Sequence, residues 1–252
     1  MINFIYNQKN TFLAISAMVI GVIFIDIHGL IVKYLGGEYS TIQLALFRNT
    51  FAIIPLILLL IYNKESSDLF KNLNKKFILF CFIRGSCFLA INILYYIAIN
   101  NMEFATASTL TFSSTFFIVI LSIFFLGDRV GIYRWSAVII GFVGVVMIMK
   151  PNSSIFSYYS ILPILVAFLW AVQVIVLKFI PDNFSTGKIQ FYSLFSSFLG
   201  SLIFIFFTTG HTYIESNTDF LILSLIGIFG GTAAILFICL LYTSDAADDV
   251  EC

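Results

Sequence analysis

The sequence predicts an all-α integral membrane protein with about eight transmembrane helices. Of its 252 residues, 60% are hydrophobic and only 10% are charged, and the mean hydropathy is +1.04. A soluble domain of this size is far more polar. The chain also carries 30 Phe, more aromatic rings than one water-excluding core of this size can hold. Lipid must therefore be the solvent for most of the surface.

Eight apolar runs follow one another along the chain, each long enough to cross a bilayer. A hydrocarbon core of roughly 30 Å needs about 20 residues at 1.5 Å rise per residue. The first run is too long for a signal-peptide core and lacks a small-residue cleavage pattern, so we expect it to be retained as a helix. The expected helices cover residues 11–35, 41–62, 77–100, 105–126, 133–149, 158–180, 189–208 and 220–242.

The distribution of lysine and arginine predicts that the N-terminus is cytoplasmic, because basic residues in short loops are kept on that side of the membrane. In this orientation only Lys33 and Lys150 fall outside. The predicted cytoplasmic set consists of Lys9, Lys64, Lys71, Lys75, Lys76, Arg129, Arg134, Lys178 and Lys188.

An internal repeat is indicated by a shift of about 145 positions. Residues 30–35 then overlay residues 175–180, so that Lys33 matches Lys178, and Gly85 matches Gly230. An odd number of helices separates the matching segments, so the two copies are inverted in the membrane. The alternative is chance similarity between apolar helices, against which the shared lysine and the constant offset argue. We expect a first five-helix repeat at residues 1–151 and three helices of an incomplete second repeat at 157–241.

The last residues, 242–252, differ in composition from everything before them. They are acidic and rich in small side chains, with Asp245, Asp248, Asp249 and Glu251 close together. They resemble translated sequencing-adapter read-through, although a genuine acidic cytoplasmic tail is the alternative. On the first interpretation this is a non-native tail on a fragment, and two further helices are expected in the natural protein.

Several short motifs lie near helix boundaries in the first 151 residues. Asp26 precedes Lys33 by seven residues, Gln43 precedes the pair Phe47-Arg48, and Arg84-Gly85 opens the third helix. The most specific stretch is LGDRV at 126–130, followed by RW at 134–135, GFVGV at 141–145 and KP at 150–151. Together these motifs resemble the EamA-type members of the drug/metabolite transporter superfamily.

The resemblance implies ten helices in two inverted five-helix repeats, in the inner (cytoplasmic) membrane of a bacterium. It implies a secondary transporter that moves a small organic metabolite, such as an amino acid or an organic anion, by alternating access. We expect the site to be lined by the first, third, fourth, sixth and eighth helices. The sequence departs from the pattern at Thr115, because a bacterial branch of the EamA-type proteins that it resembles often has proline in the middle of the fourth helix. A helix break expected there is therefore in doubt.

Three charged residues fall within the apolar runs, where charge is costly and usually faces a cavity or a partner. Asp26 and Arg48 lie at similar depth, roughly 12–14 Å below the outer boundary at 1.5 Å per residue. Arg48 would receive a substrate carboxylate or phosphate, with Asp26 as counter-ion or proton-coupling site. The alternative is a structural ion pair between two helices. Arg84 is either a substrate ligand or a snorkelling residue near the headgroups.

Uncharged polar residues within the apolar runs complete the candidate set. The fourth helix carries Thr106, Thr109 and Ser113 on one stripe and Ser108, Thr111 and Thr115 on another. Only one stripe can line a pore, and the other would bond to a neighbouring helix or to its own carbonyls. For His28, a hydrogen-bonded packing role is favoured over proton coupling. The predicted substrate-binding residues are Asp26, Arg48, Arg84, Asn92, Thr109, Ser113, Trp170 and Gln173.

Other classes of function find less support. The acidic loop residues are scattered singly and the two histidines are far apart, so the sequence shows no catalytic or metal-ligand constellation. The four cysteines suggest neither a disulfide framework nor a metal site. A receptor or assembly protein, or an enzyme without a recognisable motif, remains the alternative. The expected partners are a small-molecule substrate and the lipid bilayer. Whether protons serve as the coupling ion, and whether the protein forms a homodimer, are open questions. No cofactor and no nucleic acid are expected.

Overall fold

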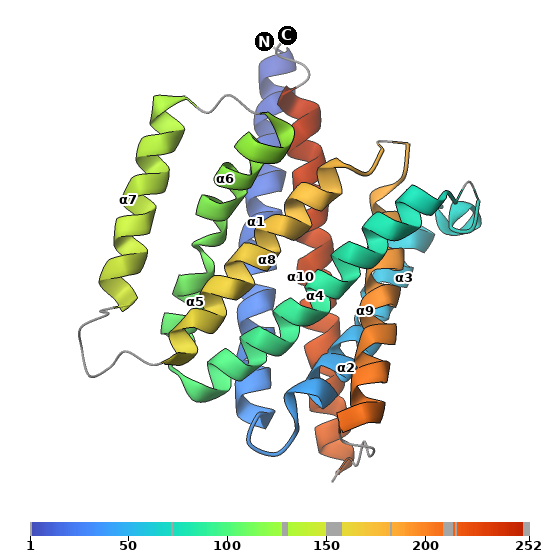
Figure 1. Ribbon diagram of the computed structural model, residues 1–252. Coiled ribbons are helices and arrows are strands. Elements are labelled where there is room, and N and C mark those ends of the chain that lie inside the picture. Colours follow the sequence, from blue (N-terminus) through green and yellow to red (C-terminus); the bar gives the residue numbers. More distant parts are fainter. Residues whose placement is uncertain are drawn as a thin grey trace.

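A computed structural model describes residues 2–71, 73–127, 131–149, 158–181, 183–208, 214 and 216–248. Within these ranges all regular secondary structure is helical, which confirms the predicted all-α membrane fold (Figure 1). Two of the residues used to predict the orientation, Arg129 and Lys150, lie outside the described residues, as does the end of the predicted tail, 249–252. The helices are α1 Ile2–Leu35, α2 Thr41–Phe51, α3 Ile53–Tyr62, α4 Lys75–Asn101, α5 Phe104–Thr111, α6 Ser114–Leu126, α7 Ile132–Met149, α8 Ile161–Lys178, α9 Thr186–Thr208 and α10 Asn217–Asp248, with short 3₁₀ turns at Ser66–Asp68 and Tyr158–Ser160.

All eight predicted apolar runs form helices. In the part of the chain that the structure describes, seven segments are long and apolar enough to cross a membrane. They are Ile15–Leu35, Thr41–Tyr62, Lys75–Asn101, Phe104–Leu126, Tyr158–Lys178, Thr186–Thr208 and Asn217–Phe237. The remaining run, residues 133–149, forms α7. This helix is not one of the seven segments and stands at the edge of the bundle in Figure 1. α10 continues through Asp248, into the segment predicted to be a separate tail.

Two of the crossings consist of two helices each. The second crossing is interrupted at Ala52, between α2 and α3. Pro55 explains this break, since proline has no N–H and its ring clashes with the carbonyl four residues earlier, here that of Phe51.

The fourth crossing is interrupted at Phe112 and Ser113 although Thr115 replaces the family's proline. The doubt about a break here was therefore misplaced. Thr109 donates to the Ala105 carbonyl at 2.7 Å, Thr111 to Ser108 at 2.6 Å and Ser113 to Leu110 at 2.7 Å. Side-chain hydroxyls that bond to carbonyls of the preceding turn compete with the backbone N–H groups and bend helices.

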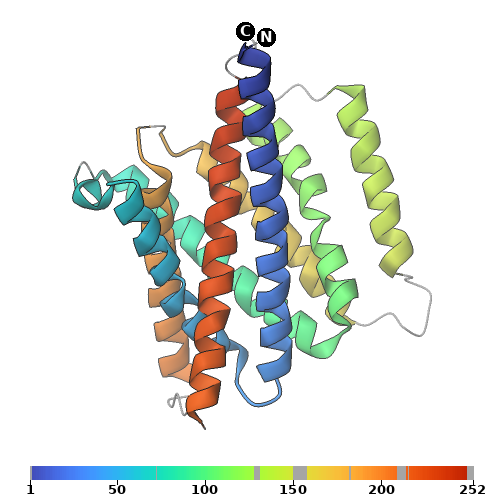
Figure 2. The same cartoon turned by 180° about the vertical axis from the view of Figure 1, so that it is seen from behind.

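The helices pack in matching pairs. α1 lies along α10, and α8 lies along α4; α2 also packs on α10, and α9 on α4, while α2 and α9 contact each other. Figure 2 shows α1 and α10 side by side over most of their length. The first turns of α1 and the last turns of α10 lie at the same end as the connection between α3 and α4, which contains Lys64 and Lys71.

Two helices begin with the same hydrogen bond. Ser40 precedes α2, and its hydroxyl accepts from the Gln43 N–H at 3.2 Å. Ser185 precedes α9, and its hydroxyl accepts from the Lys188 N–H at 3.3 Å. The offset of Ser185 from Ser40 is 185 − 40 = 145 positions, and that of Lys188 from Gln43 is 188 − 43 = 145. A serine at the N-cap satisfies an otherwise unpaired backbone donor.

Two glycines four residues apart, Gly227 and Gly231, allow α10 to approach α2 and α3 closely. A Cβ at Gly227 would lie 2.8 Å from the Arg48 carbonyl oxygen, and one at Gly231 would lie 2.7 Å from the Ala52 Cα. At Gly141 in α7, by contrast, a Cβ would meet no described atom within 4 Å.

Each end of the bundle is held by a polar contact between distant segments. At the end of α1, Lys33 donates to the carbonyls of Ile99 and Met102 at 3.0 and 2.8 Å, and the nearby Tyr39 hydroxyl donates to Asp219 at 2.9 Å. At the other end Lys188, only 6% exposed, donates to the carbonyls of Asp68 at 3.1 Å and of Lys71.

The loop bound by Lys188 has one further charge pair. Lys71 donates to the Asp68 carboxylate at 2.8 Å, and this hydrogen bond holds the pKa of Asp68 below its usual value. Both side chains are exposed, so the pair contributes little to stability.

Candidate functional site

A cavity of about 260 Å³ lies among α1, α2, α4, α5, α6, α8 and α10. The five crossings that were expected to line the site are all among them, as α1, α4, α5 with α6, α8 and α10. The second crossing also contributes, through Arg48 of α2. The wall of the cavity is mostly aromatic and aliphatic, as small-molecule sites usually are. The aromatic lining comes from Phe88, Tyr95, Phe112, Trp170 and Phe237, and the polar lining from Asp26, His28, Arg48, Asn92, Ser108, Thr111 and Ser114.

Arg48 is the buried cation of this cavity. It lies on the inward face of α2 and is only 4% exposed. Its Nη1 donates to Asn49 Oδ1 at 3.3 Å, its Nη2 donates to the Gly230 carbonyl at 3.2 Å, and its guanidinium carbon lies 4.0 Å from the centroid of the Phe88 ring. The Nε atom has no hydrogen-bond partner among the described residues. Two hydrogen bonds and one aromatic face thus fix the guanidinium and leave its Nε–H without a partner among the described residues.

Asp26 lines the same cavity as Arg48 but does not pair with it. Among the residues that the structure describes, the one ion pair within 4.0 Å joins Lys71 and Asp68. The structural interpretation of Asp26 and Arg48, a salt bridge that locks two helices, is therefore wrong for this conformation. Neither side chain is held in an ion pair among the described residues.

His28 packs on Tyr96, as the sequence favoured. It is 4% exposed, and its Nε2 lies 2.8 Å from the Tyr96 hydroxyl oxygen. The two rings are tilted by 52° with their centroids 5.6 Å apart. Yet His28 also lines the cavity beside Arg48, which the packing interpretation did not anticipate.

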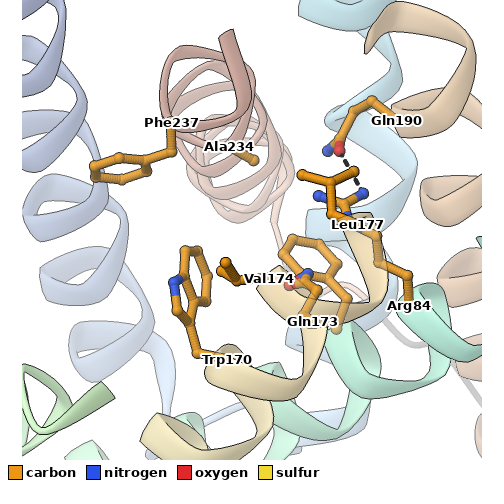
Figure 3. A pocket seen from close by; sticks show the side chains of 9 residues that line it. Arg84, Trp170, Gln173, Val174, Leu177, Gln190, Ala234 and Phe237 are labelled. Carbon is orange, nitrogen blue, oxygen red and sulfur yellow. Dashed lines mark hydrogen bonds between the residues drawn. The ribbon is translucent and has the colours of Figure 1, made fainter. Parts of the chain in front are cut away.

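A second, smaller cavity of about 30 Å³ adjoins the first and shares four of its lining residues, including Trp170 and Phe88. Figure 3 shows the Arg84 guanidinium directly beside the Gln190 side chain and joined to it by a hydrogen bond, with Trp170 farther off. Arg84 Nη1 donates to Gln190 Oε1 at 3.0 Å, and Arg84 is 7% exposed. The alternative that Arg84 snorkels to the headgroups is therefore wrong, because its head is held inside by α9.

The predicted site residues divide into three groups. Asp26, Arg48, Asn92 and Trp170 line the larger cavity, and Arg84 and Gln173 line the smaller one, where Trp170 also contributes. Thr109 and Ser113 line neither cavity, and their hydroxyls donate to carbonyls of α5.

The other stripe of the fourth crossing supplies the cavity lining, through Ser108 and Thr111. Gln190 was missed, although a glutamine within the apolar run 189–208 was the available signal.

Metal chemistry finds no candidate ligand set in the described part of the chain, where no three His, Cys, Asp or Glu side chains are grouped closely enough to hold an ion.

Fold and cavity together define a multi-pass membrane protein with a small-molecule site among its helices. Residues 12–150 match the model of the EamA-like transporter family, more than half of the chain, and the protein belongs to this family. The predicted membership is thereby confirmed, in agreement with the drug/metabolite transporter superfamily.

Curated relatives with matching segments are named riboflavin transporters. One from Rhizobium johnstonii is 40% identical over 63 residues, which is 25% of this chain and 21% of that protein. One from Vibrio cholerae is 33% identical over 78 residues, which is 31% of this chain and 26% of that protein. One from Brucella anthropi is 33% identical over 79 residues, which is 31% of this chain and 28% of that protein. The chain thus matches less than a third of the length of each of these relatives.

The fold resembles a solved crystal structure with a TM-score of 0.59. Sequence identity is 17%, and the match covers 89% of this chain and 79% of that one. At this identity the likeness concerns the fold alone.

Proposed function

We propose that this protein is a secondary transporter that moves a small organic solute across the cytoplasmic membrane by alternating access. Its family is one of membrane transporters for small molecules. The observation that carries the proposal is Arg48, a buried cation that lines a cavity inside the bundle. Among the described residues it has no ionic partner, and its Nε–H has no acceptor. Buried charges in membrane segments mark substrate and ion pathways.

The alternating-access part of the proposal rests on an inverted repeat of residues 1–151 and 157–241. Three observations support it: the matching helix pairs, the equivalent caps at Ser40 and Ser185, and the contact of α2 with α9 between the two halves. Related halves that rock about a central site are a common solution among secondary transporters. The contacts of Lys33 and Lys188 at opposite ends would then have to loosen in turn.

A cytoplasmic N-terminus follows from the same proposal. The first turns of α1 lie at the end of the bundle that carries Lys64 and Lys71 in the connection between α3 and α4. Basic residues favour the cytoplasmic side.

Riboflavin is the first solute to test, because the curated relatives carry that name. The aromatic lining of the cavity by Trp170, Tyr95 and Phe88 favours a planar ring system more generally, since rings stack on rings. A panel of riboflavin, nucleosides, aromatic amino acids and aromatic acids covers both possibilities.

Asp26 is the proposed proton-coupling residue, because it is the carboxylate of the cavity and is not held in an ion pair. Asp26→Asn should leave solute binding measurable but abolish the response of flux to an imposed proton gradient. Wild-type flux that does not change with pH or with the gradient would overturn this assignment.

Reconstituted protein in lipid vesicles tests the transporter assignment. Saturable uptake of at least one labelled solute from the panel, absent from protein-free vesicles, is the expected result. A complete absence of saturable flux across the panel would contradict transport and favour a receptor or assembly role.

A further inference from the structure

Two N–H donors without acceptors belong to residues that line the larger cavity. Arg48 Nε and Asn92 Nδ2 have no hydrogen-bond partner among the described residues, and both side chains are at least 95% buried. Both residues line the cavity. A buried N–H without an acceptor is costly, so such groups are expected to meet one supplied from elsewhere.

His28 adds a third donor through its contact with Tyr96. The Tyr96 hydroxyl is fully buried, and among the described residues His28 Nε2 is its hydrogen-bond partner. If Nε2 carried the hydrogen, the hydroxyl hydrogen would have no acceptor. Tyr96 therefore donates to Nε2, and the neutral ring carries its hydrogen on Nδ1. The ring also interacts with the Ile25 carbonyl, but Nδ1 has no hydrogen bond of acceptable geometry there.

Gly230 lies directly against the guanidinium of Arg48 and the ring of His28. A Cβ at this position would lie 3.2 Å from Arg48 Nε and 3.1 Å from His28 Cδ2, which is tighter than ordinary van der Waals contact. A side chain here would therefore press on the Nε–H of Arg48, which has no acceptor among the described residues. Gly230 lines the cavity together with Arg48 and His28.

We propose that His28, Arg48 and Asn92 form a carboxylate-binding subsite beside Gly230, in which Tyr96 holds His28 in its donor form. The subsite rests on the proposed function, since it names the class of solute as an aromatic carboxylate. A buried guanidinium favours an anion, because no carboxylate pairs with it among the described residues. Asp26 in the same cavity disfavours a phosphate dianion, whose second charge would be repelled.

The test measures binding by calorimetry to the purified full chain in nanodiscs, with phenylacetate, phenylacetamide and phenyl phosphate as probes. Phenylacetate should bind at least tenfold more tightly than phenylacetamide, and phenyl phosphate should bind more weakly than phenylacetate. Gly230→Ala should bring the acid and the amide within threefold of each other, with the affinity for the amide little changed. Gly144→Ala is the matched control, because its Cβ meets no described atom within 4 Å.

Equal affinity for acid and amide, tighter binding of the phosphate, or an unchanged acid preference in Gly230→Ala would overturn the subsite. Asn92→Leu provides a second variant should Gly230→Ala fail to fold, and it should reduce the acid preference about tenfold. Tyr96→Phe should reduce that preference too, whereas His28→Asn, which keeps a donor near the Nδ1 position, should preserve it. Saturable flux of a neutral solute, without acid preference in binding, would support the proposed transport function and contradict the subsite. Acid preference in binding without any flux would support the subsite and contradict the transport function.

Discussion

The guanidinium carbon of Arg48 lies 4.0 Å from the centroid of the Phe88 ring, so that a side chain of α2 is held against a side chain of α4. In the same cavity Arg48 binds the Gly230 carbonyl of α10. One residue thus joins three helices at the point where the solute is proposed to bind, and both stability and recognition should respond to its surroundings.

Phe88→Leu should weaken this arrangement. The variant loses a ring face worth about 0.5–2 kcal/mol to a desolvated cation, and it frees the guanidinium to move. We expect a lower unfolding temperature in detergent and a several-fold higher KM for the transported solute. Phe82→Leu, on the same helix but 59% exposed, should change neither. Equal behaviour of the two variants would show that the contact with Arg48 is unimportant.

Gly227→Ala should destabilise the packing of α10 on α2. Its Cβ would lie 2.4 Å from the Phe51 Cβ and 2.9 Å from the Ala52 backbone N, so one of the helices must shift. Overpacking of this kind costs about 1–3 kcal/mol. Thermal unfolding should show the loss, while Gly144→Ala should leave the unfolding temperature unchanged. A stable Gly227→Ala variant would mean that the two helices are less closely packed than described.

Lys188→Met should loosen the connection between α3 and α4. The ammonium group binds the carbonyls of Asp68 and Lys71, and Leu69 between them is only 8% exposed. In a variant without native cysteines, a cysteine introduced by Leu69→Cys should react with maleimide at least tenfold faster once Lys188→Met is added. Lys76→Met, at an exposed residue, serves as the control. An unchanged labelling rate would contradict the anchoring role.

Tyr39→Phe should remove the hydrogen bond to Asp219 at the opposite end of the bundle. A single net hydrogen bond contributes about 1 kcal/mol, so a small decrease in unfolding temperature is expected. Tyr34→Phe, 76% exposed, should have no effect. A decrease of equal size in both variants would argue against the contact between Tyr39 and Asp219.

Most of the fold could be predicted from the sequence because long apolar runs leave few alternatives in a bilayer. The starts of α2 and α9 were also within reach, since Thr41 and Thr186 each follow a serine able to cap a helix. The break within the fourth crossing was not predicted. It lies where three hydroxyls bond to carbonyls of their own helix, and propensity alone does not tell whether such a hydroxyl turns inward or back.

The site could be predicted only in part. Charge in an apolar run singled out Asp26, Arg48 and Arg84, and all three line a cavity. In the fourth crossing the predicted residues were Thr109 and Ser113, whereas Ser108 and Thr111 of the other stripe line the cavity. Which stripe faces inward depends on how the helix is rotated about its axis, and that rotation is set by packing against α1 and α8. The contact between Arg84 and Gln190 was out of reach for a related reason, since it joins residues 106 positions apart.

Flux through the Arg48→Ala variant tests the central claim most directly. Wild-type protein and variant are reconstituted at equal amounts, and uptake is measured for the solute that the wild type transports best. We predict that Arg48→Ala inserts normally and transports nothing above the protein-free background. Flux at the wild-type rate in that variant would contradict the assignment of Arg48 as the group that receives the solute.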